Sequence, residues 1–404
     1  MTRTPGHPGT ERSATDRCPG VFSTHSAADG AMARIRLPGG LLRPDQLLLL
    51  SAAADTHADG HLELTARANL QIRGIRDVEA VADAVVAAGL APSETHEKAR
   101  NIEVSPLTGR IGGVTDVRPL ADDLDRALRA DDSLAELSGR FLFGLDDGRG
   151  DILAQRPDAC AVAFSTDDGA VGALIAVDGA IIGEVDHLDA VPAALLDVAR
   201  ETTGNGEIWR VRDLGDVDRA ELLGRIGDRL QPASTTELTP LPDPSPLVGW
   251  FEQDEGQILL GAVVELARIP ARLAEFLAAI DTPIIITPHR EILICDLAEG
   301  VADTVVRVLA PMGLILDANS PWAAVSCCVG APGCGNALAP VRADLVERVA
   351  DDDPVTEREH WVGCSRGCGA PQGAHLRVEA TDEGYRTEPR GIDPDGVGPD
   401  RADT

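Results

Sequence analysis

The chain has little lysine, few aromatic residues and no long apolar run. Lys98 is the only lysine, and aromatic residues make up 3% of the sequence. No run of about 18 apolar residues is present, so we expect no membrane-spanning helix. The first residues lack the apolar segment of a signal peptide, which favours a cytoplasmic protein. The net charge of −30 argues against nucleic acid or a membrane surface as a partner.

Four of the eight cysteines gather near the C-terminus. Cys328 and Cys334 are spaced C-x5-C, and Cys364 and Cys368 are spaced C-x3-C, in two loops rich in glycine. In the cytoplasm thiols stay reduced, so clustered cysteines indicate a metal site more often than disulfides. Four thiolates from two loops are typical ligands of a cubane [4Fe–4S] cluster, and glycine lets backbone N–H groups approach its negative charge.

Two other interpretations of these cysteines remain open. Zinc is the main one, although structural zinc loops favour tight C-x2-C pairs. Unligated structural thiols are the other. Cys327 competes with Cys328 for the first position, but only Cys328 gives the C-x5-C spacing. We therefore predict that Cys328, Cys334, Cys364 and Cys368 bind the cluster.

The chain contains two similar β-α-β-α segments, separated by a Pro-, Ser- and Thr-rich stretch at residues 231–247. The pattern predicts a duplicated ferredoxin-like unit, and chance similarity of two generic α/β segments is the alternative. In the first copy, strands and helices are expected at Met32–Gly40, Arg43–Ala54, Leu62–Ile75 and Val78–Ala88. In the second copy, they are expected at Gln257–Leu266, Ala271–Ala279, Pro283–Cys295 and Val301–Leu309.

Basic side chains recur on one face of the predicted strands of the first copy. Alternation along Leu62–Ile75 places Arg67, Asn69, Gln71 and Arg73 on the same face. The same alternation places Arg34 and Arg36 on one face of the preceding strand. His96, Lys98 and Arg100 alternate in the same way shortly afterwards. A solvated sheet face gives this pattern too. In an acidic chain, however, a basic face favours an anion site, because guanidinium groups bind carboxylates bidentately.

Several of these segments resemble the sulfite/nitrite reductase superfamily, and the resemblance extends from about residue 17 to about residue 385. MARIRLPGG at 32–40, TARANLQIRG at 65–74 and ARNIEVSPLTG at 99–109 are similar to its strand and loop motifs. The C-x5-C and C-x3-C pair is its most specific mark. The resemblance implies a [4Fe–4S] cluster beside a sirohaem, with Cys368 also bridging to the sirohaem iron.

The same resemblance implies an α+β fold with a duplicated nitrite/sulfite reductase-like architecture. Two ferredoxin-like half-domains and two α+β domains that bind the cluster or a tetrapyrrole are expected. The expected half-domains are 17–95 and 248–320, the tetrapyrrole-binding domain without a cluster is 96–230, the cluster domain is 321–385, the linker is 231–247, and the disordered ends are 1–16 and 386–404.

Within the superfamily, the closer resemblance is to the precorrin-3B synthase family of aerobic cobalamin biosynthesis. RCPGVFSTHSAADGAMARIRLPGG near the start, RFLFGLDDGRGDI at 140–152 and GCSRGCGAPQGAHLRV near the C-terminus are similar to its motifs. The reductases carry a Lys-x-Lys pair where this chain has Arg140-Phe141-Leu142. Arg140 can replace the first lysine, but Leu142 cannot replace the second. This departure disfavours a sulfite or nitrite reductase.

The resemblance implies oxidation of precorrin-3A by dioxygen, with electrons from a reduced donor, to a product that is hydroxylated at C-20 and carries a γ-lactone. The alternatives are a sirohaem-dependent sulfite or nitrite reductase and a non-catalytic iron–sulfur redox protein. We predict that the substrate carboxylates are bound by Arg34, Arg36, Arg67, Asn69, Gln71, Arg73, Arg100 and Arg140.

A mononuclear non-haem iron is also implied by the resemblance. Its candidate ligands form no recognisable 2-His-1-carboxylate motif, and no catalytic residue can be assigned. These weak candidates are His25, His96, His289, Asp146 and Asp147.

Overall fold

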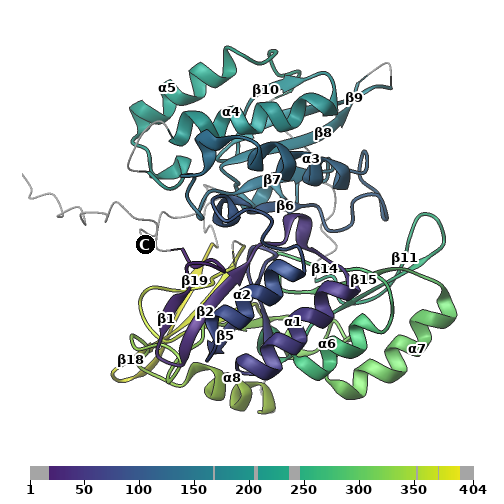
Figure 1. Cartoon of the computed structure of the whole chain (residues 1–404), viewed down its shortest axis with the longest axis vertical. Helices are drawn as coiled ribbons and strands as arrows, with labels where there is room; N and C mark the ends of the chain where they lie inside the picture. The colour runs from purple at the N-terminus through teal and green to yellow at the C-terminus, as the bar shows by residue number, and fades with distance from the viewer. Residues whose placement is uncertain are drawn as a thin grey trace, which may run out of the picture.

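The structure, a computed structural model, describes residues 18–391 except 167–168, 204–207, 236–245, 352–353 and 372. The chain forms two lobes (Figure 1). The predicted disordered segment 1–16, most of the predicted linker and the end of the predicted tail lie outside the described residues. The tail expected from residue 386 overlaps strand β19 (Gly384–Arg390), so a strand occupies the first part of that segment.

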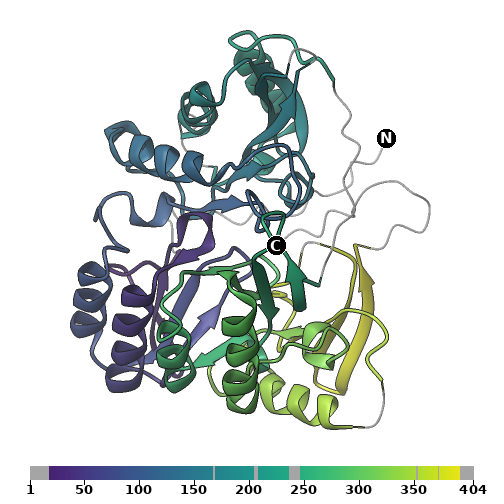
Figure 2. The same ribbon diagram turned by 90° about the vertical axis from the view of Figure 1, so that its right-hand side faces the viewer.

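Two five-stranded antiparallel sheets and four helices contain both predicted copies. The first sheet consists, in spatial order, of β1 (His25–Ala27), β2 (Gly30–Ile35), β5 (Leu70–Ile75), β4 (His61–Leu64) and β13 (Arg268–Pro270). The second consists of β11 (Gly249–Glu252), β12 (Ile258–Ala262), β15 (Ile292–Leu297), β14 (Ile284–Ile286) and β3 (Leu41–Leu42). Packed on them in a row are, in spatial order, α2 (Val78–Ala87), α1 (Pro44–His57), α6 (Ala271–Ala278) and α7 (Glu299–Leu309) (Figure 2).

The two copies exchange one edge strand each. Strand β3 belongs to the first copy but pairs with β14, where Leu42 lies opposite Ile284. Strand β13 belongs to the second copy but pairs with β4, where Arg268 lies opposite Glu63. Buried side chains from both copies share one apolar core, among them Leu50, Ile72, Leu273 and Ile294. The duplicated fold is therefore a single unit with one core.

The four predicted helices are confirmed, with small differences at their ends. Local signals explain this agreement. Asp77 caps α2 by accepting a hydrogen bond from the Ala80 N–H at 3.0 Å. Gly89, with φ +70°, follows the end of the helix. Pro44 occupies the first turn of α1, where a missing N–H costs nothing.

The two long predicted strands, Leu62–Ile75 and Pro283–Cys295, are wrong because each is a β-hairpin. The first breaks into β4 and β5, and the second into β14 and β15. Arg67 therefore lies in a turn rather than on the face of a strand. Gln71 and Arg73 remain on one face of β5.

The two hairpin turns have the same geometry. The Thr65 N–H donates to the Asn69 carbonyl at 3.0 Å, and the Thr287 N–H donates to the Glu291 carbonyl at 3.0 Å. In each turn the threonine Oγ accepts from the N–H of that same later residue, at 3.1 and 3.2 Å. A threonine that closes its own turn in this way ends the first strand of each hairpin.

The other lobe contains one mixed sheet covered by three helices. Strands β6, β7 and β8 are parallel to one another, and β9 and β10 continue the sheet antiparallel. In spatial order they are β10 (Ala180–Val185), β9 (Val171–Val177), β8 (Ala159–Ser165), β7 (Phe143–Asp146) and β6 (Ile102–Val104). The helices are α3 (Arg118–Arg129), α4 (Val191–Thr203) and α5 (Asp216–Gly227).

The cysteine loops belong to a four-stranded C-terminal sheet. Its strands are β16 (Val325–Cys327), β17 (Glu359–Val362), β18 (His375–Thr381) and β19, with α8 (Val341–Ala350) beside them. Strands β16 and β17 are parallel neighbours, so the loops that follow them leave the sheet at the same edge. In the described ranges, no helix is long and apolar enough to cross a membrane.

Candidate functional site

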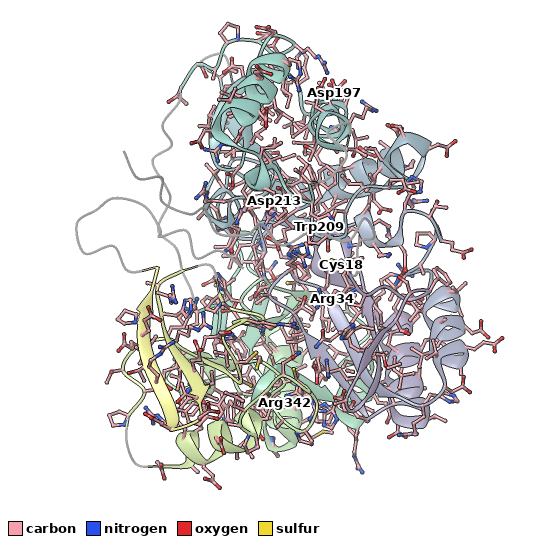
Figure 3. All side chains as sticks on the ribbon, turned by 90° about the vertical axis from the view of Figure 1, so that its left-hand side faces the viewer. Cys18, Arg34, Asp197, Trp209, Asp213 and Arg342 are labelled. Carbon is pink, nitrogen blue, oxygen red and sulfur yellow. The ribbon has the colours of Figure 1, made fainter. Side chains whose placement is uncertain are left out.

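A cavity of about 1220 Å³ is formed between the two lobes and the C-terminal sheet. Its wall includes residues from β2, β5, the β14–β15 turn, the segment 210–213 and both cysteine loops. Arg34, Cys18 and Trp209 lie one above the other along the junction of the lobes, with Arg342 nearer the C-terminal sheet (Figure 3). Pockets for drug-sized ligands have about 300–1,000 Å³. The cavity therefore suits a larger molecule.

All four predicted cluster ligands line this cavity. Cys328 directly follows β16, and Cys364 comes shortly after β17. The Gly363 N–H donates to the Cys328 Sγ at 3.2 Å. Burial, followed by the nearby thiols of Cys328, Cys364 and Cys334, raises the pKa of Cys368. Four neighbouring thiolates repel one another, and positive charge among them offsets this repulsion. The iron atoms of a [4Fe–4S] cluster would supply that charge, so this donor set fits such a cluster.

Arginines from outside the cysteine loops fix the loop backbone. Arg73, from β5, forms an ion pair with Asp29 at 2.9 Å and donates to the Gly333 carbonyl at 3.1 Å. Gly333 immediately precedes Cys334. Arg377, from β18, donates to the Ser365 carbonyl at 2.8 Å, directly after Cys364. The positions of two ligands are therefore held by charge-assisted hydrogen bonds.

The loop around Cys368 is fixed by a second pair of side chains. Arg290 donates to the Gly369 carbonyl, and His360 lies with its Nε2 3.1 Å from the Cys368 carbonyl oxygen. The other ring nitrogen of His360 lies 2.8 Å from the Ser326 Oγ. Burial, followed by the charge of Arg290, lowers the pKa of His360 to about 3, so this imidazole is neutral at ordinary pH.

The cavity wall is strongly basic. Of the eight predicted substrate-binding residues, the five that line it are Arg34, Arg67, Gln71, Arg73 and Arg140. Six more arginines line it that the sequence did not single out, namely Arg210, Arg212, Arg290, Arg342, Arg358 and Arg366. The acidic residues in the described wall are Glu63, Asp213 and Glu291. In a chain with a net charge of −30, this concentration of guanidinium groups indicates an anionic ligand.

The guanidinium groups at the junction of the lobes are crowded and partly desolvated. Burial, followed by the neighbouring Arg210, lowers the pKa of Arg67 to about 10. Burial also lowers the pKa of Arg34, whose Nε has no hydrogen-bond partner among the described residues. Arg140 lies over the Trp209 ring, with its Cζ 4.2 Å from the ring centroid. A ligand carboxylate would supply the missing counter-charge.

Arg36 and Asn69 were predicted to bind substrate but do not line the cavity. Arg36 is buried beneath it and donates to the Lys98 carbonyl at 3.3 Å. The Asn69 Oδ1 accepts from the Leu37 N–H at 2.8 Å, which fixes the chain after β2. Both predictions need correction, because these polar groups satisfy backbone atoms in the interior.

Arg100 is a clearer correction. Its side chain is buried in the lobe of the mixed sheet, where it forms an ion pair with Asp125 of α3 and donates to the Leu90 carbonyl at 2.8 Å. Its charge is paired inside the protein, and its side chain does not line the cavity. Arg100 therefore joins the two lobes rather than binding substrate.

The five candidate iron ligands do not come together. His25 and His289 line the cavity. His96 is buried elsewhere, with its Nε2 3.0 Å from the Asp131 carbonyl oxygen. Asp146 and Asp147 lie close to Asp151, and the Asp146 Oδ1 accepts hydrogen bonds from the N–H groups of Gly148 and Gly150. The predicted mononuclear iron thus has no 2-His-1-carboxylate set among these residues.

Leu142 is buried and donates its N–H to the Asp158 carboxylate at 2.9 Å. Its side chain does not line the cavity, so the position supplies no cation to a ligand. Arg210 and Arg212, on the segment WRVRD, bring cations to the same side of the cavity. Their alternation beside a tryptophan is the signal that could have identified them from the sequence.

The comparison with family models identifies the class of fold. Residues 25–88 match the nitrite/sulfite reductase ferredoxin-like half domain. A solved structure, that of the Mycobacterium tuberculosis NirA protein, superposes with a TM-score of 0.75 and 18% identity, and the match covers 92% of this chain and 77% of that one. The chain therefore has the nitrite/sulfite reductase-like α+β fold that the sequence predicted.

Individual relatives span most of the chain. A precorrin-3B synthase from Sinorhizobium sp is 26% identical over 395 residues, covering 91% of this chain and 81% of that protein. A ferredoxin–nitrite reductase from Leptolyngbya laminosa is 26% identical over 429 residues, covering 95% and 83%. A sulfite reductase hemoprotein from Chromohalobacter salexigens is 23% identical and covers 85% of this chain. The chain resembles these oxidoreductases, and the resemblance supports an enzyme.

Proposed function

We propose that the chain is a precorrin-3B synthase, which oxidises precorrin-3A with dioxygen and electrons from a reduced donor. The product is hydroxylated at C-20 and carries a γ-lactone. The observation that carries the proposal is that one cavity is lined both by the four predicted cluster ligands and by many arginines. Precorrin-3A is a tetrapyrrole with many carboxylates, so it matches both the volume and the charge of this cavity.

Each group of residues has a role in this proposal. Arg34, Arg67 and Arg140 bind carboxylates at the junction of the lobes and orient the macrocycle. The loops that carry Cys364 and Cys368 lie at the same cavity, so the ring lies beside the cluster ligands. A bound [4Fe–4S] cluster would supply single electrons there. The lobes on either side of the ring limit access of water.

A sirohaem-dependent sulfite or nitrite reductase is the second candidate. Cys368 is exposed and lines the cavity, as a thiolate that also reached a sirohaem iron would have to be. Against it stands Leu142, which replaces the second lysine of the reductases' Lys-x-Lys pair and is buried outside the cavity wall. A non-catalytic iron–sulfur protein would leave the arginine-lined cavity without a role.

Two measurements on anaerobically purified protein separate these candidates. Acid extraction should yield no stoichiometric sirohaem. Incubation with precorrin-3A, a reduced donor and isotope-labelled dioxygen should give a product whose mass shows incorporated label. Tightly bound sirohaem together with sulfite or nitrite reduction would instead establish the reductase.

A buried carboxyl group makes ligand binding depend on pH. Glu103 of β6 is 2% exposed, and its Oε2 has no hydrogen-bond partner in the described part of the chain. Burial raises the pKa of Glu103 to about 7, against the opposing effect of Arg67 and Arg210. Below this pH Glu103 is neutral, and above it the carboxylate competes with a ligand for both arginines.

We therefore expect the affinity for a polycarboxylate porphyrin such as uroporphyrin to fall as the pH rises from about 6 to about 8. The isosteric change Glu103→Gln should flatten this dependence, because the competing charge can no longer form. Fluorescence titrations of both proteins at several pH values measure the effect. The same pH slope in both proteins would show that another group is responsible.

A further inference from the structure

Arg290 occupies an unusual backbone position beside the cluster loops. It lies in the turn between β14 and β15, with φ +64°, the left-handed region that residues other than glycine seldom adopt. The Arg290 N–H donates a hydrogen bond to the Thr287 carbonyl at 2.9 Å, which closes the turn. Ala68 occupies the equivalent position of the first hairpin with φ +52°, so this conformation belongs to the repeated turn. Arg290 is distinguished by the contacts of its side chain.

The Arg290 guanidinium lies in the cavity wall and also contacts the loop that carries Cys368. It lines the cavity, and it donates a hydrogen bond to the Gly369 carbonyl, directly after the cluster ligand Cys368. Besides burial, the charged groups that act on its pKa are Cys327 and Arg358, and no carboxylate pairs with it among the residues that the structure describes. Arg73 also lies in the cavity wall and contacts a cysteine loop, but its charge is already paired with Asp29. Arg290 is therefore the loop-binding arginine whose charge a ligand can still pair with.

We propose that Arg290 couples binding of a polycarboxylate in the cavity to the reduction potential of the cluster held by the Cys368 loop. The inference rests on the proposed function, since it requires both a cluster and a carboxylate ligand. A carboxylate that pairs with Arg290 neutralises a cation that contacts this loop, so addition of an electron to the cluster becomes less favourable. Linkage is reciprocal, so reduction of the cluster must weaken binding of the ligand by the same factor.

Two other arginines provide matched controls, because each makes only one of the two contacts. Arg67 lies in the equivalent turn of the first copy and lines the cavity, but it donates to the Arg140 carbonyl at 3.0 Å, away from the cysteine loops. Arg377 donates to the Ser365 carbonyl beside Cys364 and pairs with Glu379 at 2.8 Å, outside the cavity wall.

The test is a redox titration of the anaerobic cluster-containing protein, followed by electron paramagnetic resonance, with and without saturating uroporphyrin. Binding of uroporphyrin is measured separately by its fluorescence. In the wild type we expect the potential to fall on binding, with about tenfold weaker binding to the reduced protein, which is 59 mV for one electron. Arg290→Gln should lose most of this shift, and Arg290→Lys, which keeps the charge without the planar fork, should retain part of it.

The controls should behave in opposite ways. Arg67→Gln should weaken uroporphyrin binding but keep the full shift at saturation. Arg377→Gln should change the potential of the ligand-free protein and keep the shift. A potential that bound uroporphyrin does not move, or a full shift in Arg290→Gln, would overturn the coupling and leave the polycarboxylate site standing. Absence of uroporphyrin binding to the wild type would overturn the proposed ligand class and the coupling with it.

Discussion

The cluster should be lost from the protein when any one of its four predicted ligands, Cys328, Cys334, Cys364 or Cys368, is replaced by alanine. A [4Fe–4S] cubane is typically held by four cysteine thiolates, and each of these thiols lines the same cavity. The iron content of anaerobically purified protein should fall from about four per chain to near zero, and the brown colour should disappear. Iron and sulfide analysis together with the visible absorption spectrum measures the loss.

Three of the remaining cysteines are the controls for this prediction. Cys160 and Cys295 are buried in other parts of the protein, and burial raises the pKa of both thiols, so neither is a ready thiolate. Cys160→Ala and Cys295→Ala should keep the iron. Cys327 lines the cavity beside Cys328, but Cys327→Ala should keep the iron too, because only Cys328 gives the C-x5-C spacing to Cys334. Loss of iron only in Cys327→Ala, with Cys328→Ala unchanged, would shift the ligand assignment by one residue.

Arg67→Glu should weaken uroporphyrin binding by at least tenfold, or about 1.4 kcal/mol. Arg67 lies in the cavity wall close to Arg210 and Arg34, so the change replaces attraction by repulsion at the junction of the lobes. The cluster spectrum should stay unchanged, since Arg67 donates to the Arg140 carbonyl and not to a cysteine loop. Fluorescence titration gives the affinity, and the absorption spectrum monitors the cluster.

Arg307→Glu on α7 is the matched charge reversal. Arg307 is exposed and pairs with Asp303 at 2.6 Å on the helix surface. It changes the net charge by the same amount, but its effect on a ligand in the cavity is screened by water and salt. The affinity should therefore remain close to that of the wild type. Equal affinities in Arg67→Glu and the wild type would show that the ligand binds elsewhere.

The sequence predicted the helices well and the long strands poorly, for a local reason. Helix α2 is specified by its cap at Asp77 and its stop at Gly89, which are signals within a few residues. The hairpin at Thr65–Asn69 carries no Asn-Gly or Asp-Gly turn, and polar residues continue to alternate through it. Periodicity alone therefore reads two short strands as one.

The candidate site divides in the same way. Each pair of predicted ligands lies within one short loop, so a local spacing pattern is enough to identify it. All four of these cysteines line the cavity. Alternation cannot distinguish a side chain facing a cavity from one satisfying buried backbone atoms, which is why Arg100 and Asn69 were misplaced. Arg210 and Arg290 reach the site only through the approach of distant segments. The alternation of Arg210 and Arg212 marks a basic segment in the sequence, but it does not indicate which cavity that segment lines.

The exchange of edge strands has a consequence for synthesis of the protein. Glu63 of β4 pairs with Arg268 of β13, which is 205 residues later in the chain. At about 5–20 residues per second, the ribosome delivers β13 roughly 10–40 s after β4. During this interval β4 presents an open edge that can pair with another nascent chain. Newly made protein should therefore depend on chaperones until the second copy has been translated.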